Sequence, residues 1–155
     1  MNVIPSAIPF TVTEKKMPAL TNMLAAMLWL PLSAMACSNT SPDPAEVVQA
    51  QVDAYNAHDV ATFASCYADD VTVTDLGGKR PPITGRDALK KAYAFLATRP
   101  KEFHAAIVQR VVNGPIVVDH ERLMGLPADK GPADAIAMYE VRDGKILHVW
   151  FPPRS

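Results

Sequence analysis

Two turn signals in the second half of the chain constrain its fold most strongly. Asn113-Gly114 and Asp143-Gly144 each separate two apolar, partly alternating segments. Asn-Gly and Asp-Gly between such segments indicate β-hairpins, because these residues accept the positive φ angles of tight turns. The sequence therefore predicts four antiparallel strands, at 103–112, 116–124, 135–141 and 145–151.

Helical patterns come earlier in the chain. Asp43-Pro44-Ala45-Glu46 combines an acidic cap, a proline at the first helical position and a glutamate three residues after the cap. Apolar residues at helical spacing follow this start, which predicts a first helix. A second helix is expected over 60–67, and a third between a Thr84 cap and Pro100.

A further strand is predicted at 71–75. Val71, Val73 and Asp75 share one face of this segment, and the two threonines between them share the other. Helices followed by an antiparallel sheet indicate an α+β architecture, and a curved sheet around three helices would enclose a pocket. The formal net charge is −1 and no basic patch is present, so the sequence does not favour a nucleic-acid partner.

The first 36 residues have the pattern of a signal peptide. Two lysines precede an apolar run from 23 to 32, and Ala34-Met35-Ala36 then precedes Cys37. Two outcomes stay open: cleavage before Cys37 with a lipid on its thiol, or simple cleavage after Ala36. We therefore expect an exported protein, either periplasmic or anchored to a membrane through lipid on Cys37, with residues 37–43 as a flexible tether. Because Cys37 lies at the end of the leader, a disulfide with Cys66 is not expected.

The segment Tyr-Ala-Asp-Asp-Val-Thr-Val-Thr-Asp at 67–75, with Pro-Pro-Ile-Thr-Gly-Arg at 81–86, resembles a known family. It is similar to bacterial ketosteroid isomerases and to the wider SnoaL-like group of the nuclear-transport-factor-2-like superfamily. The resemblance implies a cone-shaped α+β barrel over residues 44–152, with three N-terminal helices packed on a curved antiparallel sheet. It also implies a homodimer. This fold hosts isomerases, dehydratases, cyclases and binding proteins, so it does not assign an activity by itself.

The resemblance also implies site residues. Asp75 matches the aspartate that moves a proton in the isomerases, and a dry carboxylate on its apolar face would have a raised pKa. The alternative is that Asp75 only starts the Gly77-Gly78 turn. Gln51 and Ala137 stand at the positions of the two donors that stabilise the oxyanion, and alanine can donate no hydrogen bond, so fast steroid isomerisation is not expected.

Other candidate pocket residues are aromatic. Tyr55, Tyr67 and Tyr93 lie on inward-facing stripes, and Trp150 is placed either at the pocket floor or in a dimer interface. His120 is a candidate second acid–base group; strand alternation puts it on the face opposite Asp119 and Glu121, and its outward placement is equally open.

Two functions follow from these residues. The first is an isomerase or lyase of the steroid delta-isomerase kind, in which Asp75 removes a proton next to a carbonyl of a small apolar compound. The alternative is a non-catalytic module that binds a small apolar ligand or dimerises around a vestigial pocket. Neither a metal-binding nor a nucleotide-binding motif is present, so no cofactor is expected.

Overall fold

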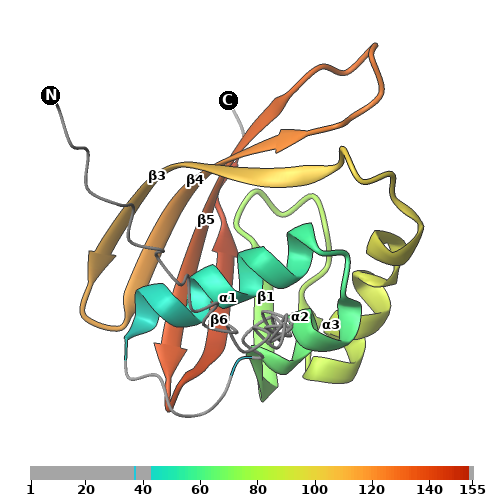
Figure 1. Ribbon diagram of the computed structural model, residues 1–155. Helices are drawn as coiled ribbons and strands as arrows, with labels where there is room; N and C mark the ends of the chain where they lie inside the picture. Colours follow the sequence, from blue (N-terminus) through green and yellow to red (C-terminus); the bar gives the residue numbers. More distant parts are fainter. Residues whose placement is uncertain (1–36, 38–42, 154–155) are drawn as a thin grey trace, which may run out of the picture. The chain divides into compact units, whose positions relative to one another are not determined.

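The computed structural model describes Cys37 and residues 43–153 (Figure 1). The predicted signal peptide and positions 38–42 of the tether lie outside these residues. In chain order the elements are α1 (Pro44–Asn56), α2 (Val60–Ser65), β1 (Tyr67–Asp75), β2 (Ile83–Thr84), α3 (Arg86–Ala92), the 3-10 helix η1 (Ala94–Thr98), β3 (His104–Asn113), β4 (Ile116–Met124), β5 (Ala133–Arg142) and β6 (Lys145–Phe151).

The six strands form one curved, open sheet in the order β2-β1-β6-β5-β4-β3, and the helices lie against one face of it (Figure 1). The α+β class and the cone-shaped arrangement are confirmed, as are the two hairpins. The sheet is mixed rather than antiparallel throughout, because β1 runs parallel to β6. Such a parallel pair needs a long connection, and the chain between β1 and β6 supplies α3 and the other strands.

Helix α1 begins as the sequence predicts. The Asp43 side chain accepts a hydrogen bond from the Ala45 amide at 2.9 Å, which satisfies one of the free N–H groups of the first turn. The helix then buries Val47, Val48 and Val52 against the sheet. Another buried position of α1 carries Gln51, a polar side chain that the apolar face alone does not explain.

Two element boundaries differ from the prediction. Tyr67 was expected in the second helix but begins β1, because Tyr67 aligns with Ile146 of β6 and the Ile146 amide donates to the Cys66 carbonyl. Thr84 was expected to cap the third helix. It pairs instead with Thr72 in the short strand β2, and α3 begins after Gly85 without a side-chain cap.

The two cysteines form a disulfide, so the expectation that they stay unpaired is wrong. Cys37 and Cys66 have their Cα atoms 4.7 Å apart and are separated by 29 positions in the sequence. The Lys145 ammonium donates hydrogen bonds of 2.7 Å to the Cys37 carbonyl and 2.7 Å to the Ser65 carbonyl. Cys37 is thus held at the end of α2 by a covalent bond and by one lysine.

A buried ion pair joins α1 to the sheet. Arg110 donates two hydrogen bonds of 2.7 Å to the carboxylate of Asp119, which is fully buried. The same guanidinium also reaches the Ala45 carbonyl at 3.2 Å and the Gln49 side chain at 3.0 Å. The pairing of Arg110 with an acid across the hairpin agrees with strand alternation, which places Asp119 on the inner face of the sheet.

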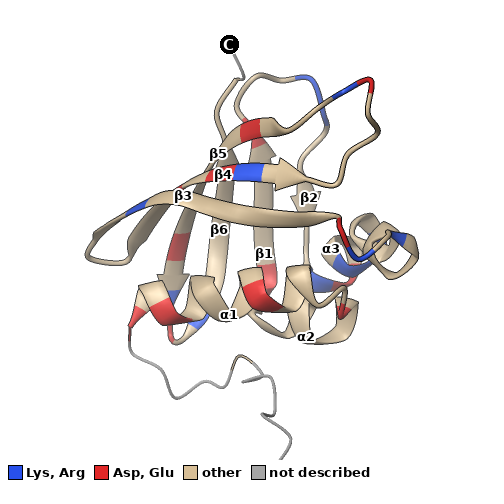
Figure 2. Ribbon diagram, turned by 45° about the horizontal axis from the view of Figure 1, so that its top comes forward, with Lys and Arg blue, Asp and Glu red and all other residues tan. Residues whose placement is uncertain are grey.

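Charged residues are interspersed over the elements that the structure describes (Figure 2). Within the same residues, no helix has the length and apolarity needed to cross a membrane. Inside the domain, the concave face of the sheet meets the helices around a cavity.

Candidate functional site

A cavity of about 530 Å³ lies between the helices and the concave face of the sheet. Its walls are mostly apolar and rich in aromatic rings, which come from Tyr55, Tyr67, Tyr93, Phe95, Phe103, Tyr139 and Phe151. Five polar or charged side chains also reach it: Gln51, Asp75, Arg80, Arg99 and Glu121. A pocket of this size, apolar with a few polar groups, has the usual composition of a small-molecule site.

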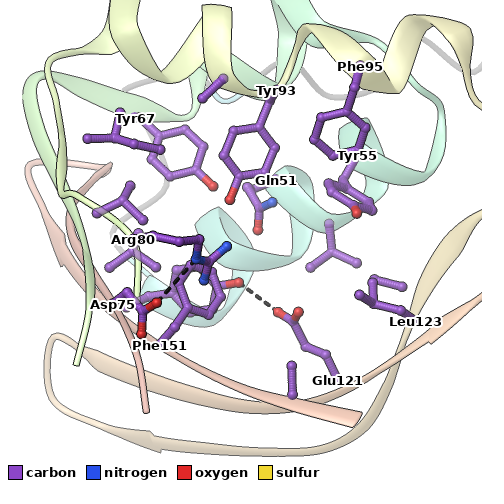
Figure 3. A pocket seen from close by; sticks show the side chains of 18 of the residues that line it. Gln51, Tyr55, Tyr67, Asp75, Arg80, Tyr93, Phe95, Glu121, Leu123 and Phe151 are labelled. Atoms are coloured by element: carbon purple, nitrogen blue, oxygen red, sulfur yellow. Dashed lines mark hydrogen bonds and ion pairs between the residues drawn. The ribbon is translucent and has the colours of Figure 1, made fainter. Parts of the chain in front are cut away.

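Five of the predicted site residues come together here. Gln51, Tyr55, Tyr67, Asp75 and Tyr93 all line the cavity, and Figure 3 shows the tyrosine hydroxyls directed into it. They are brought together from α1, β1 and the end of α3. The catalytic or binding roles expected of them stay predictions.

Asp75 belongs to both the cavity wall and a turn. Its carboxylate accepts a hydrogen bond from the Gly77 amide at 2.9 Å and another from the Arg80 side chain at 3.2 Å. The Asp75 side chain is 12% exposed, whereas that of Arg80 is 68% exposed. The carboxylate is therefore partly buried but already neutralised by an arginine from the solvent side (Figure 3).

These contacts reverse the expected direction of the pKa shift of Asp75, which is lowered rather than raised. Desolvation alone raises the pKa, but the hydrogen bonds from Gly77 and Arg80 and the charge of Arg80 together lower it below its usual range. Each of these contacts favours the charged form. The carboxylate is thus ionised and already hydrogen-bonded to Gly77 and Arg80, which makes it a weaker base than a dry, unpaired aspartate.

Three candidate site residues lie away from the cavity walls: the pocket position expected of Ala137 is wrong, and the open placements of His120 and Trp150 are decided toward the outer face. Ala137 is fully buried in the core and aligns with Asp119. His120 lies on the outer face of the sheet, with its Nε2 atom 3.1 Å from Asp134. Trp150 is also on that face, where its ring stacks on His148 at 5.5 Å. Strand alternation explains the outward histidine and tryptophan, because their neighbours Glu121 and Phe151 point inward.

Glu121 is a buried acid of the cavity wall that sequence reasoning did not select. It lies on β4, is 9% exposed and accepts a hydrogen bond of 2.7 Å from the Tyr139 hydroxyl. The available signal was the same alternation that sends His120 outward, since it places the neighbouring acids on the inner face. Because it lies on the inner face of a strand, Glu121 is as much a candidate site residue as Asp75.

The cavity keeps its tyrosines neutral over a wide pH range. Burial, followed by the negative charge of Glu121, raises the pKa of Tyr93 to about 12. Burial is also the main cause that raises the pKa of Tyr139 well above its usual value, and Glu121 is the next largest cause. The hydroxyls therefore act as hydrogen-bond donors and acceptors at neutral pH.

No group of three or more His, Cys, Asp or Glu side chains within the described ranges is arranged to hold a metal ion.

Comparisons with known proteins agree with this architecture. The family model of the SnoaL-like domain matches residues 48–149. An uncharacterised cystatin-fold protein from Novosphingobium aromaticivorans has 27% sequence identity and a TM-score of 0.62, over 72% of this chain and 98% of that chain. No curated protein matches the chain.

Two further structures share the fold at lower identity. A putative ketosteroid isomerase from Kribbella flavida is 21% identical, with a TM-score of 0.59 over 72% of this chain and 78% of its own. An LEH-like epoxide hydrolase from Mycobacterium tuberculosis is 19% identical, with a TM-score of 0.57 over 70% of this chain and 80% of its own. Since the family model matches more than half of the chain, the chain belongs to the SnoaL-like domain family.

Proposed function

We propose that this domain binds a small, largely apolar molecule in the cavity between its helices and its sheet. The observation that carries the proposal is the cavity itself: about 530 Å³, walled by aromatic and aliphatic side chains, with a few polar groups among them. Burial of an apolar ligand against such walls is favourable because it removes apolar surface from water.

Binding of a neutral apolar fluorophore, N-phenyl-1-naphthylamine, tests this proposal. We expect a saturable rise in fluorescence with the wild-type domain. Ala92 is exposed and lines the cavity, so Ala92→Trp should obstruct it and weaken binding by about 10-fold, equivalent to 1.4 kcal/mol. Ala94→Trp is the matched control, because Ala94 is also exposed but does not line the cavity. Absence of saturable binding, or equal loss in both variants, would refute the proposal.

A second candidate function is a cofactor-free isomerase or lyase, favoured by the position of the Asp75 carboxylate in the cavity wall. Asp75 would take a proton from a carbon next to a ligand carbonyl and return it to another carbon, and the Gln51 amide would polarise that carbonyl. The Arg80 ion pair favours the binding function over this one, because it stabilises the Asp75 carboxylate and so makes it a weaker base. Asp75→Asn distinguishes the two: turnover would be lost under the enzyme function, whereas ligand affinity would be retained under the binding function.

We also propose that the domain works outside the cytoplasm, after cleavage behind Ala36 and without a lipid. The Cys37–Cys66 disulfide supports this location, because disulfides persist in oxidising compartments. A lipid thioether would need the same Cys37 sulfur, so the two modifications exclude each other. Intact-mass measurement of the exported protein tests the proposal: a chain beginning at Cys37 with no lipid mass supports it, and a lipid adduct contradicts it.

A further inference from the structure

Gln51 carries a buried acceptor that is left unpaired. Its side chain is 5% exposed and lines the cavity, and its Oε1 atom has no hydrogen-bond partner among the described residues. A buried acceptor that has lost its contact with water without gaining a donor is unfavourable. Gln51 is therefore stabilised when a molecule in the cavity supplies an N–H or O–H group.

Two tyrosine hydroxyls face the same cavity. Tyr67, which is 3% exposed, and Tyr93 both line its wall, and neither hydroxyl has a hydrogen-bond partner within the part of the chain that the structure describes. Figure 3 shows both hydroxyls and the Gln51 amide directed into the interior. Each hydroxyl can therefore donate a hydrogen bond to a bound molecule or accept one from it.

Aromatic packing holds these groups close together. The ring of Phe63 is fully buried, and its centroid lies 5.1 Å from that of Tyr67 and 4.7 Å from that of Tyr93. Tyr55 lies four residues after Gln51, on the same side of α1, and its ring centroid is 6.5 Å from that of Tyr93. Gln51, Tyr67 and Tyr93 thus present their polar groups to the cavity from neighbouring, well-packed positions.

This cluster of Gln51, Tyr67 and Tyr93 offers one acceptor and two donors. The tyrosines stay protonated at neutral pH, because burial above all raises the pKa of Tyr93 to about 12 and the pKa of Tyr67 well above its usual value. A hydroxyl group both donates and accepts hydrogen bonds, whereas a ketone oxygen only accepts and an ammonium only donates. A carboxylate also only accepts, and it would have to give up its hydration in a cavity with mostly apolar walls.

We propose that the cluster of Gln51, Tyr67 and Tyr93 recognises the hydroxyl group of a neutral ligand whose apolar body fills the rest of the cavity. The ligand hydroxyl donates a hydrogen bond to Gln51 Oε1 and accepts one from a tyrosine hydroxyl. The ligand is thus an apolar alcohol. This inference rests on the proposed binding function and specifies the chemical class of the ligand.

Two probes with one apolar body test the inference: adamantan-2-ol, which can donate a hydrogen bond, and adamantan-2-one, which cannot. By isothermal titration calorimetry at pH 7, we expect the alcohol to bind at least about 10-fold more tightly to the wild-type domain, because it alone pairs Gln51 Oε1. Gln51→Met keeps the length of the side chain without the amide, so it should remove this preference, mainly by weakening the binding of the alcohol. Its thermal unfolding is measured alongside, and the wild-type comparison decides the inference if this variant fails to fold.

Gln109→Met is the matched control, because Gln109 is exposed on β3 and does not line the cavity. It should retain the preference for the alcohol. If the ketone binds as tightly as the alcohol, or if Gln51→Met keeps the preference, the hydroxyl inference is overturned while the binding function stands. The same holds if the neutral fluorophore binds and neither probe does. If the fluorophore and both probes fail to bind, both proposals fail.

Discussion

Reduction of the Cys37–Cys66 disulfide should destabilise the domain substantially. The bond closes a segment of 29 positions, and the entropy that this closure removes from the unfolded chain corresponds to about 3.6 kcal/mol at 25 °C. For a domain of this size, such a loss lowers the melting temperature by roughly 10–15 °C. The folded contacts of Lys145 with the Cys37 and Ser65 carbonyls remain possible after reduction, so the change reports mainly on the covalent bond.

Urea unfolding of the mature domain, with and without reductant, measures this difference directly. Cys37→Ser without reductant should match the reduced wild-type protein, and its stability should not respond to reductant. We chose Cys37 because it is slightly exposed, whereas a change at fully buried Cys66 would also alter core packing. A difference below about 1 kcal/mol, or two free thiols in the unreduced unfolded protein, would refute the reasoning.

Two further comparisons test the packing around the cavity. Arg110→Met should lower the free energy of unfolding by about 3–5 kcal/mol, because it leaves the charge of Asp119 buried without its partner. Arg122→Met, whose partner Asp134 is half exposed, should lower it by less than about 1 kcal/mol in the same urea assay. Equal losses in the two variants would contradict the argument. Gly125→Ala should lower the free energy of unfolding by more than about 3 kcal/mol, since φ is +68° and a Cβ atom would overlap the backbone of Glu102 and Phe103. Gly114→Ala, at φ +56° with open space around it, should cost only about 1 kcal/mol in thermal unfolding, and the reverse order would be inconsistent with the structure.

The strands of the second half could be predicted from the sequence because their signals are local. Asn113-Gly114 and Asp143-Gly144 specify hairpins between adjacent segments, and β4 and β6 begin and end where the pattern predicts. The parallel pairing of β1 with β6 depends on contacts between segments far apart in the chain, and the early start of β1 at Tyr67 follows from it. Such pairing overrides the helical pattern that Tyr67 shares with Phe63.

The site was predictable to a similar extent. Helical spacing identified the tyrosines as inward-facing, the family resemblance selected Gln51, and the structure places them all in the cavity wall. The Arg80 contact with Asp75 and the disulfide of Cys37 could not be predicted, because each joins residues through the path of a loop that has no periodic signal. The homodimer implied by the family resemblance stays a prediction, for which light scattering of the purified domain is the measurement.

The pKa of Asp75 tests most directly whether this residue is a general base or an ion-paired part of the wall of a binding cavity. Carbon-detected NMR titration of the carboxyl carbon in the mature domain measures it. The account predicts a pKa below the ordinary value of 3.8, because Gly77 and Arg80 stabilise the charged form. With the folded pKa below the unfolded one, this carboxylate contributes stability above about pH 4 that is lost as the pH falls through the folded pKa. A pKa well above 3.8, insensitive to Arg80→Met, would contradict the account and identify Asp75 as a dry carboxylate poised for proton abstraction.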